Sequence, residues 1–203
     1  RNREVDILVG TQMVTKGHDL PSVTLVGVIN ADAALSIPDF RAAERAFQLM
    51  VQVAGRAGRA DAKGRVLIQT YDPENAAVTF AATHNVNGFL EREFSDRKEL
   101  LYPPFSRMAL VRVDAPDEMV AREACETLTQ VALSVKGGEK GVDVIGPAAA
   151  PIARVRNRYR FRTMIRAAER PALRRICAAM LRAVPSLPRT VRCTVDIDPV
   201  QLL

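Results

Sequence analysis

The sequence predicts an α/β chain in two parts, and three observations lead to this prediction. Short apolar runs alternate with helical patterns through residues 1–102, as in a parallel or mixed sheet covered by helices. Pro103 and Pro104 follow, and because two prolines cannot continue a helix, we place the domain boundary here. The order β-α-β-β-α-β then predicts a small α+β ferredoxin-like domain over residues 103–203.

The first part has three predicted strands and three predicted helices. The strands are short, rich in β-branched residues and bounded by turn residues, and they cover residues 5–10, 24–30 and 66–70. Asp39 is expected to cap a helix that runs to about Ala60, and two more helices are expected at 74–83 and 87–100. Because the sequence starts at Arg1 and enters a strand-like run at once, we expect it to begin within a fold.

The second part has a clear alternating pattern. Strands are predicted at 106–114, 142–145, 158–166 and 191–197, with helices at 117–135 and from Pro171 onward. Because alternate residues of a strand share a face, Phe161, Thr163 and Ile165 are expected to point into the core.

Arginines recur at every second position from Arg154 to Arg162. In an extended segment the same alternation turns Arg158, Arg160, Arg162 and Arg166 away from the core. Arg112 and Arg192 fall on this open face by the same parity, so we expect a basic face that binds DNA, with a solvated charged face as the alternative. Tyr159 can stack on a base if the strand begins later.

The net charge of +6 is unevenly distributed. Residues 103–203 contain 17 Lys/Arg and 10 Asp/Glu, whereas residues 1–102 contain 12 and 13. A basic half indicates a nucleic-acid partner, although a membrane surface or an acidic protein also fits. No apolar run approaches the roughly 20 residues that span a bilayer, and the three separated cysteines are typical of a reducing cytosol, so we expect a cytoplasmic protein.

The most specific motif is the Q-x-x-G-R-x-G-R string at residues 52–59. Arg56 and Arg59 lie three positions apart at one helix end and so project in nearly the same direction. Guanidinium groups bind phosphate in a bidentate manner, and such a pair suits a γ-phosphate whose charge spreads during hydrolysis. The simpler alternative is a basic helix end that complements the helix dipole.

A second motif is the polar loop Gly10–Asp19, directly after a predicted strand. Thr11, Gln12 and main-chain N–H groups can hold a nucleic-acid phosphate, and Lys16 can add a cation. A plain polar connector is the alternative. His18 receives no catalytic role.

Motifs V and VI of superfamily 2 helicases resemble two stretches here, ILVGTQMVTKGHDLPSVTLVGVINAD and DFRAAERAFQLMVQVAGRAGR. Within that superfamily the chain most resembles the bacterial primosomal replication-restart helicases. Four later stretches are also similar to that family, so the resemblance spans essentially the whole chain: GRVLIQTYDPE, LLYPPFSRMALVRVDA, RYRFRTMIRA and VDIDP.

The resemblance implies part of a RecA-like helicase lobe over residues 1–102, followed by the family's basic DNA-binding domain. It implies that Gln52, Gly17 and Asp19 lie near the nucleotide, with Arg56 and Arg59 as arginine fingers. Thr11 and Gln12 match the part of motif V near DNA. Arg170 lies near where the family docks the acidic tail of single-stranded-DNA-binding protein, and Arg174 extends this second basic patch.

The resemblance further implies an ATP-dependent 3′→5′ helicase that binds stalled or forked DNA and restarts replication with primosome loading proteins. ATP and Mg²⁺ would be shared with a lobe upstream, and the family's Zn²⁺ would be held by an insertion that this chain lacks. The chain has no G-x-x-x-x-G-K-[ST] phosphate loop, so these 203 residues are expected to be inactive alone.

Two other interpretations stay open at this stage. One is a non-catalytic nucleic-acid-binding module, which would have no use for paired phosphate fingers. The other is a different superfamily 2 repair helicase, which Arg56 and Arg59 do not exclude.

Asp196 and Asp198 more simply end a strand than bind a metal, because no third ligand is evident.

Overall fold

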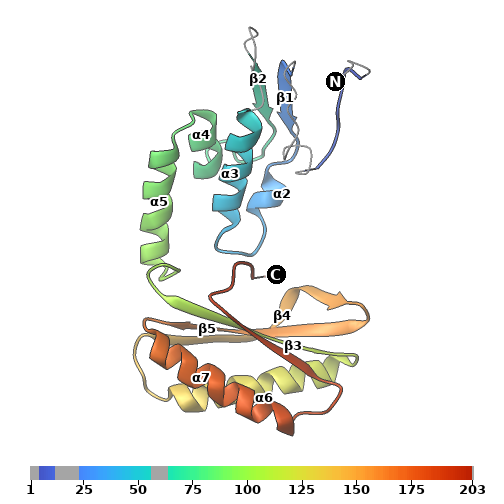
Figure 1. Cartoon of the computed structure of the whole chain (residues 1–203), viewed down its shortest axis with the longest axis vertical. Coiled ribbons are helices and arrows are strands. Elements are labelled where there is room, and N and C mark those ends of the chain that lie inside the picture. The colour runs from blue at the N-terminus through green and yellow to red at the C-terminus, as the bar shows by residue number, and fades with distance from the viewer. Residues whose placement is uncertain (1–4, 12–22, 56–63, 203) are drawn as a thin grey trace. The chain divides into compact units, whose positions relative to one another are not determined.

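The computed structural model describes residues 5–11, 23–55 and 64–202. The chain divides into two compact units, Arg1–Ser95 and Asp96–Leu203 (Figure 1). The division falls within helix α5 (Val86–Glu99), earlier than the boundary predicted after Tyr102. The residues after α5 are tied to one another, because the Ser106 hydroxyl donates to the Leu101 carbonyl (2.6 Å).

Unit 1 is a layer of helices against two parallel strands. Strands β1 (Leu25–Val28) and β2 (Arg65–Ile68) pair in parallel, which confirms the parallel pairing that the sequence predicted here. The helices are α2 (Asp32–Leu35), α3 (Ala42–Ala54), α4 (Ala76–Ala82) and α5. Their core is centred on Phe47, which stacks on Phe89 with ring centroids 4.0 Å apart, and on the buried Met50.

The strand predicted at residues 5–10 is wrong. The segment has no strand hydrogen bonding, and its apolar side chains are exposed, with Val9 at 84%. A strand needs the main chain of a neighbour, and in the part of the chain that the structure describes β1 pairs with β2 alone. Alternating apolar residues therefore did not suffice to predict this element.

Helix α3 begins later than predicted, with Arg41 as its N-cap. The Asp39 carboxylate still stabilises this end, because it accepts hydrogen bonds from the Arg41 N–H (2.9 Å) and from the Arg45 guanidinium (3.0 Å). The expected extension toward Ala60 lies outside the described residues.

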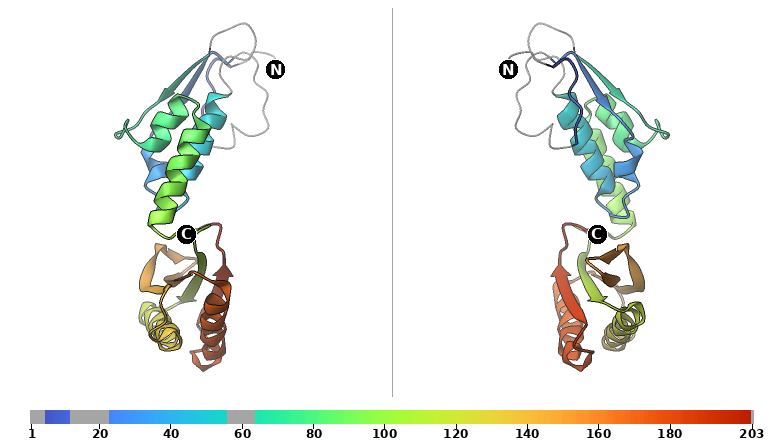
Figure 2. Two further views of the ribbon diagram at one scale, coloured as in Figure 1. Left: turned by 90° about the vertical axis from the view of Figure 1, so that its left-hand side faces the viewer. Right: turned by 90° about the vertical axis from the view of Figure 1, so that its right-hand side faces the viewer.

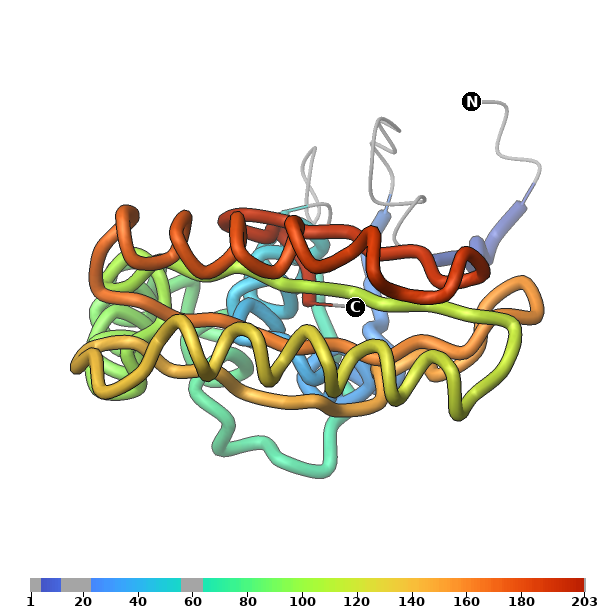
Figure 3. The backbone as a smooth tube through the Cα atoms, turned by 90° about the horizontal axis from the view of Figure 1, so that it is seen from below, coloured from blue at the N-terminus to red at the C-terminus, as the bar shows by residue number. Residues whose placement is uncertain are grey.

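Unit 2 contains a four-stranded antiparallel sheet with strand order β4-β5-β3-β6. Its elements follow the predicted order: β3 (Arg107–Ala115), α6 (Glu118–Lys136), β4 (Val142–Val155), β5 (Arg158–Ala167), α7 (Arg170–Ala183), a short 3-10 turn (Val184–Ser186) and β6 (Arg192–Ile197). Helices α6 and α7 lie side by side on one face of the sheet (Figures 2 and 3). Together, the parallel and antiparallel sheets confirm a mixed α/β chain.

The core of unit 2 lies between the sheet and its two helices. As predicted, Phe161, Thr163 and Ile165 are buried on the helix-covered face. The buried Thr163 hydroxyl is satisfied by hydrogen bonds with the Thr129 hydroxyl (2.6 Å) and the Cys125 thiol (3.4 Å). No helix within the described ranges is long and apolar enough to cross a membrane.

Strand β4 is the main difference from the prediction in unit 2. It extends to Val155 and shifts register twice against β5, after Ile145 and after Ala149. At the first shift Gly146 has a positive φ of 133°, and a Cβ there would lie 2.9 Å from the Arg162 carbonyl oxygen. Only glycine therefore fits this close approach of the two strands.

The chain then turns back at Arg156 and Asn157, so the arginines at alternate positions do not all share one strand. Arg154 belongs to β4 and Arg156 to the turn, whereas Arg158, Arg160 and Arg162 belong to β5.

Candidate nucleic-acid interface

The strand register places the predicted basic residues on the open face of the unit 2 sheet. Arg112 on β3 lies opposite Arg162 on β5, and Asp114 on β3 lies between Arg160 on β5 and Arg192 on β6. Because directly paired residues share a face, the five predicted DNA-binding arginines of this unit come together there: Arg112, Arg158, Arg160, Arg162 and Arg192.

Several of these guanidinium groups are already engaged by the protein. Arg158 binds the Asp114 carboxylate and donates to the Thr190 carbonyl (2.6 Å). Arg112 lies 3.9 Å from the Asp196 carboxylate, near the limit for an ion pair. These carboxylates offset part of the positive charge that the sequence alone displays on this face.

Arg166, like Arg158, is held by several contacts with the protein. Its guanidinium donates to Asp143 Oδ2 from Nε (3.0 Å) and from Nη2 (2.6 Å), and to the Leu100 carbonyl from Nη1. It also lies over the Tyr102 ring at 5.9 Å. Arg166 therefore holds the loop after α5 against the sheet rather than presenting a free charge.

Two arginines of the face differ from these. Within the described part of the chain, no carboxylate pairs with Arg160 or Arg192. Arg192 is exposed and Arg160 is partly exposed. They lie on either side of Asp114, whose carboxylate is bound by Arg158, so the cationic charge of this region is concentrated on these two side chains.

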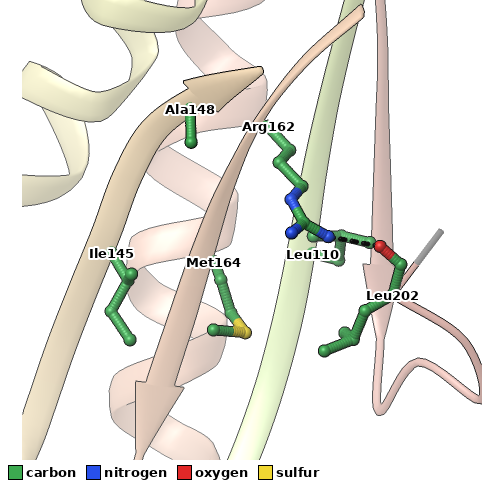
Figure 4. A pocket seen from close by; sticks show the side chains of 6 residues that line it. All are labelled: Leu110, Ile145, Ala148, Arg162, Met164 and Leu202. Carbon is green, nitrogen blue, oxygen red and sulfur yellow. Dashed lines mark hydrogen bonds between the residues drawn. The ribbon is translucent and has the colours of Figure 1, made fainter. Parts of the chain in front are cut away.

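A small apolar cavity of about 90 Å³ opens beside the charged part of the face (Figure 4). Its lining residues are Leu110, Ile145, Ala148, Arg162, Met164 and Leu202. The Arg162 guanidinium donates to the Leu202 carbonyl oxygen, and the Asp198 N–H donates to the Met108 carbonyl (2.8 Å). Residues 199–202 thus fold back over the open face and use a donor of Arg162.

The second basic patch lies at the start of α7. Arg170 and Arg174 are both exposed, and among the residues described neither has a carboxylate partner. The adjacent Arg175 differs, because it forms an ion pair with Glu139. The structure therefore leaves Arg170 and Arg174 accessible on a face separate from the open side of the sheet.

In unit 1 the structure describes two of the predicted site residues. Gln52 lies on α3 and lines a cavity of about 340 Å³ with the polar side chains of Arg45 and Gln48 and several apolar ones. Thr11 is exposed. The other predicted residues lie outside the described ranges: Gln12, Lys16, Gly17, Asp19, Arg56 and Arg59.

The titratable groups add little chemistry to these sites. Burial raises the pKa of Cys177 to about 11 and, with a contribution from Cys125, that of Cys193 to about 11. Burial also raises the pKa of Cys125. The thiols are therefore protonated at neutral pH. No group of three His, Cys, Asp or Glu side chains suited to a metal occurs in the described part of the chain.

Sequence reasoning missed two features near these sites. One is the cavity beside Gln52, to which Arg45, Gln48 and Gln52 of α3 contribute polar side chains. The other is the exposed tip of the β4–β5 hairpin, because the arginine alternation concealed the turn at Arg156 and Asn157.

Known proteins have sequences similar to nearly the whole of this chain. The family model for the primosomal protein N C-terminal domain matches residues 98–200. The replication restart protein PriA of Synechocystis is 40% identical over 200 residues, covering 98% of this chain and 23% of its own length. The protein of the same name from Bacillus subtilis is 38% identical over 204 residues, covering 98% of this chain and 25% of its own.

The Treponema pallidum protein of that name is 38% identical over 203 residues, covering all of this chain and 30% of its own length. The chain thus spans between about a quarter and a third of the relatives it matches. Among solved structures, the match to the de novo designed protein Foldit4 covers 46% of this chain and 97% of the designed chain at 13% identity. Its TM-score of 0.38 is too low to support any conclusion. The match over half of its length shows that the chain belongs to the primosomal protein N C-terminal domain family.

Proposed function

We propose that this chain is part of an ATP-dependent 3′→5′ DNA helicase. That helicase would bind stalled or branched replication forks in the bacterial cytoplasm and restart replication through primosome assembly. The observation that carries the proposal is the match to proteins named replication restart protein PriA over 98% of the chain, which includes both the arginine motif and the basic unit.

Within this proposal residues 1–102 form part of a RecA-like lobe and contact the nucleotide. Gln52, Gly17 and Asp19 would face ATP, and Arg56 and Arg59 would act as arginine fingers on the γ-phosphate. The position of Gln52 on α3, beside a cavity of about 340 Å³, supports its assignment to nucleotide binding. Mg²⁺ would neutralise the charge that develops on the phosphates during hydrolysis, but this chain lacks the phosphate loop that holds the β-phosphate.

Residues 103–203 form a ferredoxin-like domain in this proposal, which the strand order and the two helices on one face support. Its open face would contact the DNA backbone through Arg112, Arg158, Arg160, Arg162 and Arg192. Arg160 and Arg192 would contribute most, because neither forms an ion pair with a carboxylate of the described chain. Such contacts position DNA without reading its sequence.

In addition to DNA, we propose two kinds of protein partner. The exposed Arg170 and Arg174 would bind the acidic tail of single-stranded-DNA-binding protein, since two guanidinium groups without carboxylate partners suit an acidic peptide. Primosome loading proteins would bind the complete protein. Zn²⁺ would belong to an insertion outside these 203 residues.

The test is Arg59→Ala in a longer protein that contains this chain and a phosphate loop. We expect the DNA-stimulated hydrolysis rate to fall roughly 10³-fold or more, with a much smaller change in ATP affinity, because a finger acts mainly in the transition state. Arg59→Lys should restore little, since lysine lacks the planar fork. DNA binding should persist. If hydrolysis stays near wild type, or if all three properties fall together, Arg59 is not a finger.

A further inference from the structure

The β4–β5 hairpin ends in an exposed arm, residues 151–157. Val155 pairs with Arg158, so Arg156 and Asn157 form a two-residue loop, and both have positive φ (48° and 59°), as in a type I′ turn. On the β4 side, the register shift between Ala149 and Arg154 leaves residues 150–153 facing a single residue of β5. The arm therefore combines a tight turn with a bulge (Figure 1).

The charge of the arm is not compensated. Residues 144–168 contain six arginines and no acidic residue. At the far end of the hairpin Arg166 is held by Asp143, whereas at the tip Arg154 and Arg156 are exposed and have no carboxylate partner among the described residues. Arg154 instead lies 4.9 Å over the Tyr159 ring, which keeps its guanidinium at the surface.

The bulge that precedes Arg154 is apolar. Pro151 and Ile152 are exposed, with Ile152 at 52%, and Val155 beyond Arg154 is exposed as well. Single exposed apolar side chains are common, but here three of them are bordered by Arg154 and Arg156. A partner for the arm therefore needs both phosphate groups and an apolar surface within a few ångströms of each other.

The turn itself adds a further indication. Arginine is disfavoured at positive φ, where asparagine or glycine costs less free energy. Arg156 occupies such a position although its side chain makes no hydrogen bond, ion pair or ring contact within the described part of the chain. Local backbone strain of this kind is found at binding sites.

Resting on the DNA-binding function proposed above, we propose that this arm binds the junction at which duplex DNA opens into single strands. The Pro151–Ile152 bulge packs on the exposed face of the last base pair, and Arg154 and Arg156 hold the flanking phosphates. A closed duplex hides its base faces by stacking, whereas a junction presents one base-pair face beside two backbones. Isoleucine and proline are side chains that proteins place against base steps.

The test compares three DNAs by fluorescence anisotropy with the 203-residue chain: a fork, a duplex closed by hairpins at both ends, and a single strand. We expect wild type to prefer the fork over the closed duplex about tenfold, as burial of one aliphatic side chain allows. Ile152→Ser should abolish this preference and leave the affinity for the other two DNAs unchanged, whereas Ile152→Leu should retain it. Leu181→Ser, an equally exposed leucine on α7, is the matched control.

The arginines are tested in the same assay. Arg154→Ala combined with Arg156→Ala should weaken fork binding about tenfold and reduce the salt slope by about 2, since each lost phosphate contact removes about 0.9. Lys140→Ala combined with Arg182→Ala removes the same charge from exposed positions elsewhere and should change little. Thermal unfolding checks that all variants remain folded.

Three results would overturn the proposal. Fork preference that survives Ile152→Ser, or is lost equally in Leu181→Ser, would mean that the bulge does not contact the junction. If the arm variants bind like wild type while Arg160→Ala combined with Arg192→Ala weakens all binding, the arm does not bind DNA, but the function proposed above still holds. If the wild-type protein binds none of the three DNAs, both the role of the arm and the proposed DNA binding are wrong.

Discussion

The two faces of the unit 2 sheet use the same strands for different purposes. On the helix-covered face, Val111, Val113 and Ile165 are completely buried under α6 and α7. On the open face, Arg112 and Asp114 of the same strand remain partly exposed, whereas Met108 and Leu110 further toward its start are buried. A sequence period of two thus separates apolar from charged side chains only over the second half of β3.

The open face itself is not uniform. Toward Arg166 it is held together by an ion pair with Asp143 and a main-chain contact, whereas toward Arg156 the Asp114 carboxylate pairs with Arg158 and leaves Arg160 without a carboxylate partner in the described part of the chain. The number of arginines in a segment therefore overestimates the number that can bind phosphate. Which arginines are available depends on the carboxylates that the sheet register brings beside them.

The largest effect should come from the helix-covered face. Ile165→Ala should lower the free energy of unfolding of unit 2 by about 3 kcal/mol, because the side chain is fully buried and a cavity remains. Met164→Ala, one position away on the open face, should cost clearly less, since Met164 is only partly buried. Chemical denaturation of both variants measures the difference. Equal losses would mean that the two faces do not divide the roles as described.

A smaller effect is expected where an arginine is already paired. Arg166→Ala should lower the free energy of unfolding by about 1–2 kcal/mol, since it removes charged hydrogen bonds to Asp143 and the contact with Leu100. Arg160→Ala should stay within about 0.5 kcal/mol, because no carboxylate in the described chain depends on it. Thermal unfolding distinguishes the two, and similar melting temperatures would contradict the assigned pairing.

Much of unit 2 could be predicted from sequence, because its signals are local. The alternation in β5 gave the correct faces, and Asp117 and the glycines after Lys136 mark the ends of α6. The length of β4 could not be predicted. Its first register shift occurs where Gly146 approaches Arg162 and Thr163 on the neighbouring strand, and a contact between strands leaves little trace in a single sequence.

The candidate site was predictable in composition but not in pairing. Parity placed Arg112 and Arg192 on the face of Arg162, and the strand register agrees. The neutralisation of Arg158 by Asp114 depends on pairing between strands 44 positions apart in sequence. In unit 1 the run at residues 5–10 looked like a strand, but an isolated apolar pattern does not specify a hydrogen-bonding partner.

In the turn between β4 and β5, a substitution is expected to raise the stability of the fold and not to lower it. Arg156→Asn should raise the free energy of unfolding by about 0.5–1 kcal/mol, because asparagine tolerates the positive φ of this position better than arginine does. The same variant should weaken fork binding. Thermal unfolding and DNA anisotropy on one preparation measure both, and a destabilised variant would mean that the arginine side chain supports the fold.

The smallest effect at neutral pH concerns the cysteines. Burial raises the pKa of Cys177 and Cys193 to about 11 from the ordinary 9.0, so the folded state favours the neutral thiols. Their stabilisation should be complete below about pH 9 and should be lost as the pH rises toward about 11. Urea unfolding across pH 7–11 tests this. The control is the Cys177→Ala and Cys193→Ala double variant, in which this loss of stability should be absent. If the free energy of unfolding of the wild type is as constant up to pH 11 as that of the variant, the thiols do not contribute in this way.

The most direct test of the account is the salt dependence of fork binding for two charge-matched double variants. Arg160→Ala with Arg192→Ala removes the two arginines without carboxylate partners on the open face of the sheet. Lys140→Ala with Arg182→Ala removes two exposed charges elsewhere in unit 2. If the open face binds DNA, the slope of log affinity against log salt should decrease by about 2 for the first variant and hardly change for the second. Equal decreases would show that overall charge, rather than the open face, binds DNA.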